Sequence, residues 1–268
     1  MKITYSNNGQ AMPSYTKHID PSAFTSSDST EIYWLGNAST IIHSHSTNIL
    51  IDPLLEGFDM KGLIEFPITS KELKDIDGVL LTHIDNDHFS RPTCTSIKSV
   101  TKMYHAPGYV ADVLQEEGYP SCKHDINECF SIKDINICLT PAKHDWQNYS
   151  KKWQYRKWEE SDYCGYYLTC KEGKIWMPGD SKLLECQLHM EEPDVILFDF
   201  SDNEWHITFD GAVKLANAYP NARLLCIHWR CVDASEMTSF NADPNKLKEH
   251  IVNPERVLDI VPGEKVTL

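Results

Sequence analysis

The feature that most constrains this chain is the segment Thr82-His-Ile-Asp-Asn-Asp-His-Phe89, which packs four potential metal ligands into six consecutive residues. They are His83, Asp85, Asp87 and His88. The preceding run, 78–82, is apolar and predicts a buried strand. Side chains two residues apart on an extended chain share a face, so His83 and Asp85 can converge on one ion. Beyond the turn, Asp87 and His88 can address a second position nearby. The alternative is a polar loop whose acids cap the helix that follows.

Short β-rich runs and helical segments alternate along the rest of the chain. The predicted strands are 32–35, 40–44, 48–51, 78–82, 102–105, 137–142, 175–177, 195–198 and 224–228. One predicted helix begins after Ser90, and three others cover 109–117, 209–218 and 243–252. This pattern favours a layered α/β or α+β architecture, with two sheets between outer helices. Repeats and low-complexity linkers are missing from the sequence, so we expect a single domain over residues 1–268.

Charge and cysteine content limit the classes of function. Lys and Arg number 25 against 39 Asp and Glu, a net charge of −14 that repels phosphate backbones and anionic membrane surfaces. We therefore expect no nucleic-acid partner. The longest apolar runs fall far short of the ~18–20 residues that cross a bilayer, so no membrane span is expected. Nine scattered cysteines, an odd number, indicate reduced core thiols in a cytoplasmic protein rather than a disulfide framework.

Three further strand ends carry ligand-type side chains. His144, Asp180 and His228 each follow an apolar, strand-like run. Loops at one end of the strands of a layered fold gather at a common edge, which is where binding sites form. We therefore expect these residues to join the segment 82–89. Asp52 also follows an apolar strand, and we expect it to orient the metal loop through hydrogen bonds rather than to bind metal.

In this combination the motifs resemble those of the metallo-β-lactamase superfamily. Its signature His-x-His-x-Asp-His corresponds to His83-Ile-Asp85-Asn-Asp87-His88, with aspartate in place of the middle histidine. The other shared motifs are Trp34-Leu-Gly-Asn-Ala-Ser39, Ile49-Leu-Ile-Asp-Pro53, Pro141-Ala-Lys-His144, Pro178-Gly-Asp180-Ser181 and Ile227-His228. The branch that the chain resembles most contains L-ascorbate-6-phosphate lactonase and the N-acylphosphatidylethanolamine phospholipase D type enzymes.

The resemblance implies a four-layer αβ/βα sandwich with metals at the edge between the two sheets. It assigns a first metal site to His83, Asp85 and His144, and a second to Asp87, His88 and His228. Asp180 would bridge the two. The resemblance thus implies one or two divalent ions, which would be zinc, manganese or iron. It also gives Asp180, Asp87 and His206 as catalytic residues. His206, like His105, stands where related proteins approach the pocket.

The activity implied is that of a metal-dependent hydrolase. Two metals would lower the pKa of a water held between them, and the hydroxide would attack an ester, lactone or phosphodiester. One alternative is a metal-binding protein of the same fold without turnover. Another is a nucleic-acid-processing hydrolase, which the charge of −14 disfavours. The expected partner is a small-molecule substrate, which can be anionic. The sequence is also compatible with a homo-oligomer.

Three local features allow more specific predictions. A carboxylate is a harder donor than an imidazole, so Asp85 should make the first site less selective for zinc. Segment 145–162 is rich in cations and aromatics. One interpretation is a lid over the pocket, in which cations contact an anionic substrate and tryptophans form the pocket walls. The cations would be Lys151, Lys152, Arg156 and Lys157, and the tryptophans Trp146, Trp153 and Trp158. The other interpretation is a surface loop or a dimer contact. His43 and His45 alternate along a strand and predict a solvated face.

Overall fold

The chain folds around two β-sheets. The structure, a computed structural model, describes residues 2–7, 9–229, 231–233 and 237–268. The first sheet has the strand order β15-β3-β4-β5-β6-β7-β8. Its strands are β3 (Thr30–Gly36), β4 (Ser39–Ser44), β5 (Thr47–Ile51), β6 (Gly78–Leu80), β7 (Tyr104–Pro107), β8 (Ser121–His124) and β15 (Lys265–Thr267). Strands β3, β4 and β5 form antiparallel hairpins, while β5, β6, β7 and β8 pair in parallel.

The second sheet has the order β14-β13-β12-β11-β10-β9. Its strands are β9 (Cys129–Ile132), β10 (Ile135–Pro141), β11 (Cys164–Thr169), β12 (Lys174–Met177), β13 (Val195–Phe198) and β14 (Arg223–Cys226). Strands β9 to β12 are antiparallel, and β12, β13 and β14 are parallel. A separate pair joins β1 (Ile3–Tyr5) to β2 (Ala11–Pro13).

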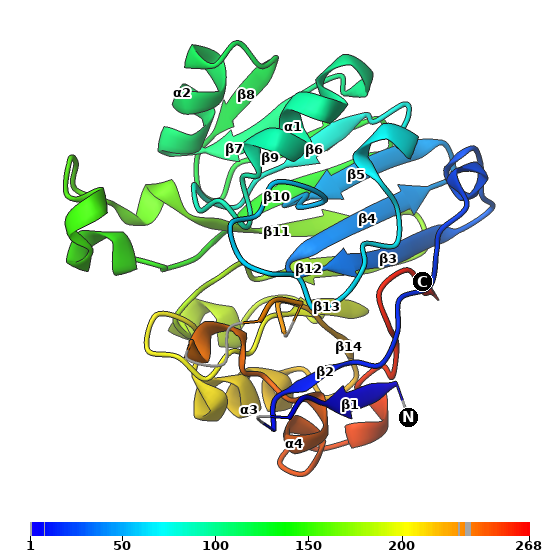
Figure 1. The fold of residues 1–268 in the computed structure, drawn as a ribbon, viewed down its shortest axis with the longest axis vertical. Coiled ribbons are helices and arrows are strands. Elements are labelled where there is room, and N and C mark those ends of the chain that lie inside the picture. The colour runs from blue at the N-terminus through cyan, green and yellow to red at the C-terminus, as the bar shows by residue number, and fades with distance from the viewer. Residues whose placement is uncertain (1, 8, 230, 234–236) are drawn as a thin grey trace.

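Helices cover the outer sides of the sheets. The α-helices are α1 (Arg91–Ile97), α2 (Gly108–Glu116), α3 (Phe209–Ala218) and α4 (Pro244–Lys248). Short 3₁₀ helices are η1 (Pro21–Phe24), η2 (Ser70–Glu72), η3 (Lys98–Val100), η4 (Trp146–Tyr149), η5 (Lys151–Trp153), η6 (Glu160–Asp162), η7 (Glu185–Leu188), η8 (Thr238–Phe240) and η9 (Pro254–Arg256). Figure 1 shows α1 and α2 beside strands β6 to β8, and α3 and α4 near β13 and β14. Among the described residues, every helix is too short or too polar to cross a membrane.

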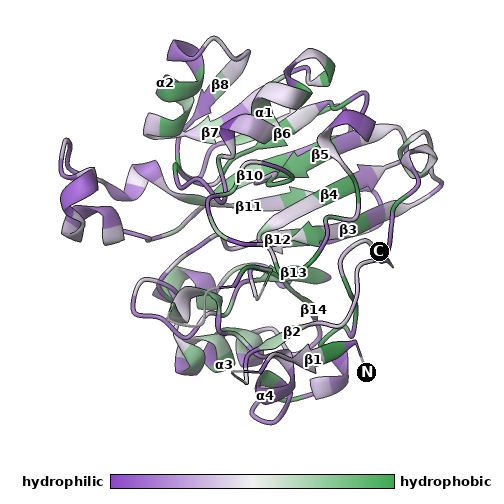
Figure 2. Cartoon of the chain, in the orientation of Figure 1, coloured by the Kyte–Doolittle hydropathy of each residue, from purple (hydrophilic) through white to green (hydrophobic). Residues whose placement is uncertain are grey.

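Alternation along β3 shows how the layers form. Ile32 and Trp34 point into the core shared by the two sheets, whereas Tyr33 and Leu35 point into a second core with α1 and α2. Successive residues of a strand face opposite sides, so one strand serves both cores. Figure 2 shows hydrophobic residues along strands such as β5, whereas the segment between β10 and β11, which projects from the sheets, is largely hydrophilic. The predicted four-layer αβ/βα fold is confirmed.

Two sequence predictions about the fold are wrong in detail. The helix predicted over 243–252 ends at Lys248 as α4, because Val252 N–H donates to the side chain of Asn217 at 2.9 Å instead of continuing the helix. The cysteines are not all reduced. Cys129 and Cys138 stand directly opposite each other in the β9–β10 register, with Cα atoms 4.0 Å apart, and form a disulfide.

The predicted solvated face at His43 is also wrong. Its side chain is completely buried, because η1 lays Phe24 against that face of β4, with ring centroids 6.1 Å apart. The Nδ1 atom of His43 lies 2.6 Å from Oδ1 of Asn48, which satisfies it inside the core. His45 is partly exposed and pairs with Glu172 at 2.8 Å. Both histidines therefore have structural partners.

Candidate metal centre

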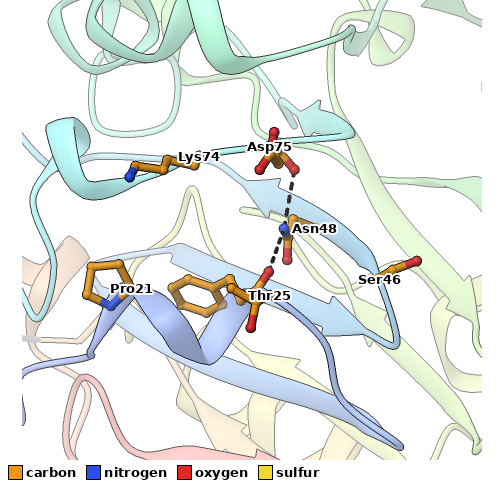
Figure 3. Close-up of a pocket in the computed structure, with 7 residues that line it drawn as sticks. Pro21, Thr25, Ser46, Asn48, Lys74 and Asp75 are labelled. Atoms are coloured by element: carbon orange, nitrogen blue, oxygen red, sulfur yellow. Dashed lines mark hydrogen bonds between the residues drawn. The ribbon is translucent and has the colours of Figure 1, made fainter.

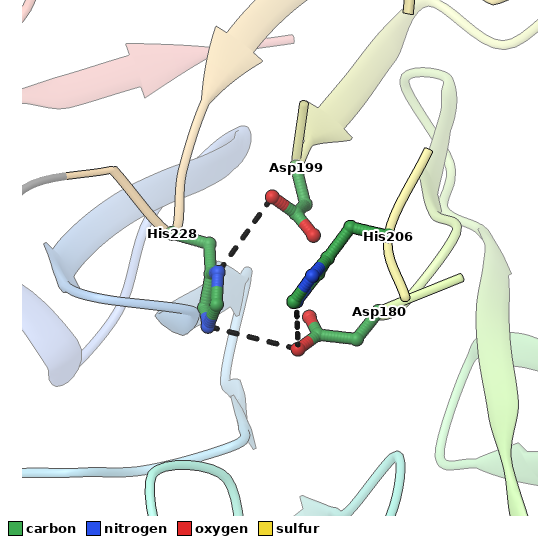
Figure 4. Close-up of side chains that lie close together, drawn as sticks. All are labelled: Asp180, Asp199, His206 and His228. Carbon is green, nitrogen blue, oxygen red and sulfur yellow. Dashed lines mark hydrogen bonds and ion pairs between the residues drawn. The ribbon is translucent and has the colours of Figure 1, made fainter. Parts of the chain in front are cut away.

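Strand ends from both sheets deliver histidines and aspartates to one place. The segment 82–89 follows β6 of the first sheet, and His144 follows β10 of the second. Asp180, Asp199 and His228 follow β12, β13 and β14. Figure 4 shows the last three converging with His206, which lies in the loop before α3. The gathering predicted from the sequence is thus present, and it joins the edges of two sheets.

The first predicted ligand set comes together as expected. Oδ2 of Asp85 lies 3.3 Å from Nε2 of His83 and 3.5 Å from Nε2 of His144. One ligand atom from each of these three buried residues lies within 4.8 Å of the others. Such a group can enclose a single divalent ion.

The second predicted set is equally close. Oδ2 of Asp87 lies 3.2 Å from Nε2 of His228 and 3.7 Å from Nε2 of His88. The three ligand atoms again lie within 4.8 Å of one another. This set also contains two imidazoles and one carboxylate, so the two groups offer matching donors.

Asp180 lies between the two groups. Its Oδ2 atom is 3.1 Å from Nε2 of His88 and 3.7 Å from Nε2 of His228. Asp180 also forms a close group with His83 and His88, which belong to different predicted sets. Asp180 therefore lies where the family resemblance placed it, next to residues of both groups. His206 adjoins it, with Nε2 at 3.1 Å from the same oxygen.

Two imidazole nitrogens indicate that the group fits a metal. Nε2 of His83 and Nε2 of His88 are buried and form no hydrogen bond of acceptable geometry among the described residues, although carboxylate oxygens lie 3.3 and 3.1 Å away. Their Nδ1 atoms face Thr82 Oγ1 at 3.0 Å and Asp52 Oδ2 at 2.8 Å. A buried polar atom without a partner costs free energy, and coordination of a cation would remove that cost. The donor set of imidazoles and carboxylates suits zinc, manganese or iron.

The charges of the centre are strongly coupled. Burial would lower the pKa of His88, but Asp180, Asp87 and Asp52 together raise it well above its usual value. For Asp87, burial acts to raise the pKa, yet His88 and His228 lower it to about 2. The carboxylate of Asp87 is therefore ionised at neutral pH, and its charge is paired with the neighbouring imidazoles.

Asp52 has the supporting role predicted for it. Its Oδ1 accepts a hydrogen bond from Thr82 N–H at 2.8 Å, and its Oδ2 accepts from Thr82 Oγ1 at 2.6 Å. The same Oδ2 faces Nδ1 of His88. Asp52 thus fixes both the start of the metal loop and the orientation of one imidazole.

Sequence analysis missed two supporting residues. Oδ1 of Asp199 lies 3.6 Å from Nδ1 of His228, and Asp199 belongs to a close group with Asp180, His206 and His228. Its position directly after a predicted strand could have revealed it. The side-chain amide of Asn37 donates to Oδ2 of Asp87 at 3.4 Å, and the backbone carbonyl of Asn37 accepts from the backbone N–H of His228 at 2.8 Å. Asn37 has a φ of 48° in the turn between β3 and β4, where asparagine is favoured.

The other candidate histidine has different neighbours. Nδ1 of His105 lies 3.0 Å from Nε2 of His124, and its ring stacks on Phe130 with centroids 4.5 Å apart. His124 in turn faces Glu128 at 3.0 Å. His105 and His124 therefore form a small cluster of their own, and the expectation that His105 approaches the pocket is not supported by these contacts.

Segment 145–162 meets the centre through its first residues. Trp146 Nε1 donates to Oδ2 of Asp85 at 2.7 Å. Farther along, Arg156 pairs with Asp162 at 3.0 Å and Lys157 with Glu159 at 2.8 Å. The predicted wall residue Trp158 is instead buried in the core that contains α1 and α2. Lys151 and Lys152 are exposed and have no acidic partner among the residues that the structure describes.

A surface cavity of about 300 Å³ lies elsewhere (Figure 3). It is lined by Pro21, Phe24, Thr25, Ser46, Asn48, Lys74 and Asp75. Ser46 precedes β5 and Asp75 precedes β6, so the cavity adjoins the opposite ends of these strands from the metal loop. Asn48 Nδ2 already donates to the carbonyls of Phe24 and Asp75 at 3.2 Å. The side-chain amide of Asn48 is thus used internally.

Residues 47–229 match the family described as the Beta-lactamase superfamily domain. This span is more than half of the chain and includes every candidate ligand. The chain belongs to the beta-lactamase superfamily. The superfamily resemblance inferred from the motifs is thereby confirmed.

Individual proteins extend the comparison. The chain is 23% identical over 247 residues to a UPF0173 metal-dependent hydrolase of Pyrococcus horikoshii, covering 89% of this chain and 99% of the relative. Igni18, a metallo hydrolase from Ignicoccus hospitalis, superposes with a TM-score of 0.69 at 16% identity, over 90% of this chain and 98% of that one. An isothiocyanate hydrolase from Delia radicum gut bacteria gives a TM-score of 0.68 at 16% identity, over 89% and 99% of the two chains. The two structures show that the beta-lactamase superfamily fold extends over most of the chain.

Proposed function

We propose that this protein is a metal-dependent hydrolase of an ester, lactone or phosphodiester. The observation that carries the proposal is the meeting of two buried ligand groups at Asp180. Membership of the beta-lactamase superfamily and similarity to a relative named a metal-dependent hydrolase support it. The finer resemblance to lactonases and to phospholipase D type enzymes is part of the proposal.

The proposed ligands are the seven residues predicted from the sequence. They are His83, Asp85 and His144 for the first ion, Asp87, His88 and His228 for the second, and Asp180 for both. We propose that one or two divalent ions bind, zinc, manganese or iron. When bound, such ions activate water and polarise the scissile carbonyl or phosphoryl oxygen.

The protein's own part is to hold these groups in place. Asp180 and Asp87, both ionised, are the proposed catalytic carboxylates. His206 is the third proposed catalytic residue, since its Nε2 lies 3.1 Å from Oδ2 of Asp180 and can donate a hydrogen bond to it. Nδ1 of His206 is buried without a hydrogen-bond partner among the described residues.

The proposal extends to the setting of the reaction. Both sheets contribute ligands and share a core, which supports one domain over residues 1–268. The net charge of −14 argues for a small-molecule substrate rather than nucleic acid. Exposed Lys151 and Lys152 would favour an anionic one. Seven cysteines are free thiols, which supports a cytoplasmic location despite the disulfide.

Metal analysis combined with a substrate panel tests the proposal. The protein, stripped with chelator and reloaded with zinc, manganese or iron(II), is assayed on phosphodiesters, lactones, esters and acyl amides. We expect up to two ions per chain and turnover that depends on them. His83→Ala and His228→Ala should each lose metal. Metal binding without turnover on any substrate would favour a binding protein of the same fold, and full metal content in both variants would contradict the ligand assignment.

A further inference from the structure

Both carboxylate oxygens of Asp85 accept hydrogen bonds from the segment that follows His144. Trp146 Nε1 donates to Oδ2 at 2.7 Å, and Gln147 Nε2 donates to Oδ1 at 2.8 Å. Oδ2 is also the oxygen nearest His83 and His144. We propose that Trp146 and Gln147 are positioning residues that hold Asp85 as a ligand of the first metal position. This inference rests on the proposed function, because it assumes that Asp85 binds the first ion.

The direction of each hydrogen bond is fixed. Gln147 is fully buried, and its Oε1 accepts a hydrogen bond from the hydroxyl of Tyr163 at 2.7 Å. A phenol keeps its proton at neutral pH, and burial raises the pKa of Tyr163 further. The amide of Gln147 must therefore direct its NH₂ group at Asp85. An indole N–H can only donate, so Trp146 has the same polarity.

The segment is itself braced, which makes these donors stationary. Asn148 and Trp158 exchange two hydrogen bonds of 2.9 Å between side-chain amide and backbone. Trp158 Nε1 donates to the carbonyl of Trp153 at 2.9 Å, and the ring of Trp153 packs on that of Trp146 at 6.1 Å. Trp146 and Gln147 thus approach Asp85 from a folded support rather than from a loose loop.

These contacts suit an aspartate and would not suit the histidine of the superfamily signature. A carboxylate accepts hydrogen bonds at both oxygens and still has lone pairs for an ion. A neutral imidazole has one acceptor nitrogen, which it needs for the metal. Trp146 and Gln147 would then face a ring without free acceptors. The aspartate and its two donors are therefore a matched set, which gives segment 145–162 a role in metal binding.

Metal affinity, measured without a substrate, tests this proposal. Manganese and zinc are titrated into apo protein in competition with a chromophoric chelator. Trp146→Phe and Gln147→Leu should each weaken the first site about 10- to 100-fold, the usual effect of losing a partner of a metal ligand. Trp176→Phe is the matched control, because its indole also donates while buried, but to Thr140 at 3.2 Å. It should bind metal like wild type.

Tyr163→Phe provides a milder variant in case the first two fold poorly. It frees the amide of Gln147 to turn, so a weaker loss in the same direction is expected. Tyr166→Phe is its control, since that hydroxyl donates to the carbonyl of Leu81 at 2.8 Å and not to Gln147. Thermal melting of the apo proteins separates weakened metal binding from weakened folding.

The decisive comparison uses an Asp85→Ala background. If Trp146 and Gln147 act through Asp85, substituting them in the Asp85→Ala protein should not lower its metal affinity any further. Affinity that falls equally in both backgrounds would overturn the proposal, as would Trp146→Phe and Gln147→Leu proteins that match their control. Unchanged affinity in Asp85→Ala alone would instead contradict the ligand role of Asp85 in the proposed function.

Discussion

The Nδ1 atom of His88 lies 2.8 Å from Oδ2 of Asp52, and both side chains are completely buried. Asp52 directly follows β5, while His88 lies in the loop after the neighbouring parallel strand β6. The contact therefore links two strand ends and directs the Nε2 atom of His88 toward Asp180 at 3.1 Å.

We predict that Asp52→Asn weakens metal binding about 10- to 100-fold, because the amide cannot supply the charge that orients His88. Chelator competition measures the change. Asp77→Asn is the control. Asp77 is also buried, but it faces Lys102 at 2.6 Å and Lys133 at 2.8 Å, away from the centre. That variant should lose stability and keep its metal. Equal metal affinity in the two variants would contradict the role of Asp52.

Asp180→Ala should cost more activity than the loss of an outer ligand such as His144. The shared carboxylate sets the relation between the two groups, so we expect kcat to fall roughly 10³-fold or more. Elemental analysis should find at most one ion per chain, in a protein whose circular dichroism is unchanged. Turnover near that of wild type would remove Asp180 from the centre of the mechanism.

Asp85→His should shift the first site toward zinc, since an imidazole replaces a hard oxygen donor. The test is the ratio of zinc to manganese affinities, measured for wild type and variant under the same conditions. An unchanged ratio would show that Asp85 does not tune the metal. The activity optimum of wild type should lie at higher pH than that of the variant, because added carboxylate charge makes a bound water less acidic.

His105 should make the apo protein sensitive to acid. Burial, and then the neighbouring His124, lower its pKa to about 4, whereas an unfolded histidine titrates near ~6.5. Between these values the unfolded chain binds a proton that the folded chain does not. The free energy of unfolding therefore falls as the pH drops through this window, by up to about 3 kcal/mol, and is constant above it.

Urea denaturation from about pH 4.5 to pH 7.5 measures this dependence. His105→Gln should flatten the curve across that window. His189→Gln, which changes an exposed histidine on the surface pair with Glu185, should leave the slope as in wild type. If the free energy of unfolding of the His105→Gln variant depended on pH as steeply as that of wild type, other groups would be the cause of the acid sensitivity.

The exposed lysines of segment 145–162 provide a test of substrate charge. Replacing Lys151 and Lys152 by alanine should raise KM several-fold for an anionic substrate without changing kcat. For a neutral substrate of the same reaction type, both KM and kcat should stay as in wild type. Lys157→Ala is the control, because Lys157 already pairs with Glu159. Similar losses for both substrates would indicate that the segment serves structure alone.

Much of the centre could be predicted because its residues stand just beyond apolar strands. His144, Asp180 and His228 each follow such a run, and the order of the motifs placed them at one edge. The contacts that Trp146 and Gln147 make with Asp85 could not be predicted in this way. Gln147 reaches Asp85 across 62 positions of sequence through a 3₁₀ turn, which has no hydrophobic period to identify it.

For the fold as well, some features could be predicted from the sequence and others could not. Short β-rich runs, such as 32–35 and 48–51, appear as β3 and β5. The disulfide and the burial of His43 depend on which residues become neighbours across strands and turns. That information is absent from local patterns, and so these features were missed.

The distance along the chain between the ligands bears on how the protein matures. His83 and His228 are 145 residues apart, and every group that gathers at Asp180 draws on segments synthesised at different times. When the ribosome has synthesised residues 82–89, the nascent chain still lacks the later residues that complete either ligand group. Metal captured at that stage would be held loosely and exchanged. Tight binding of an ion by either proposed ligand group would therefore require both sheets to have formed.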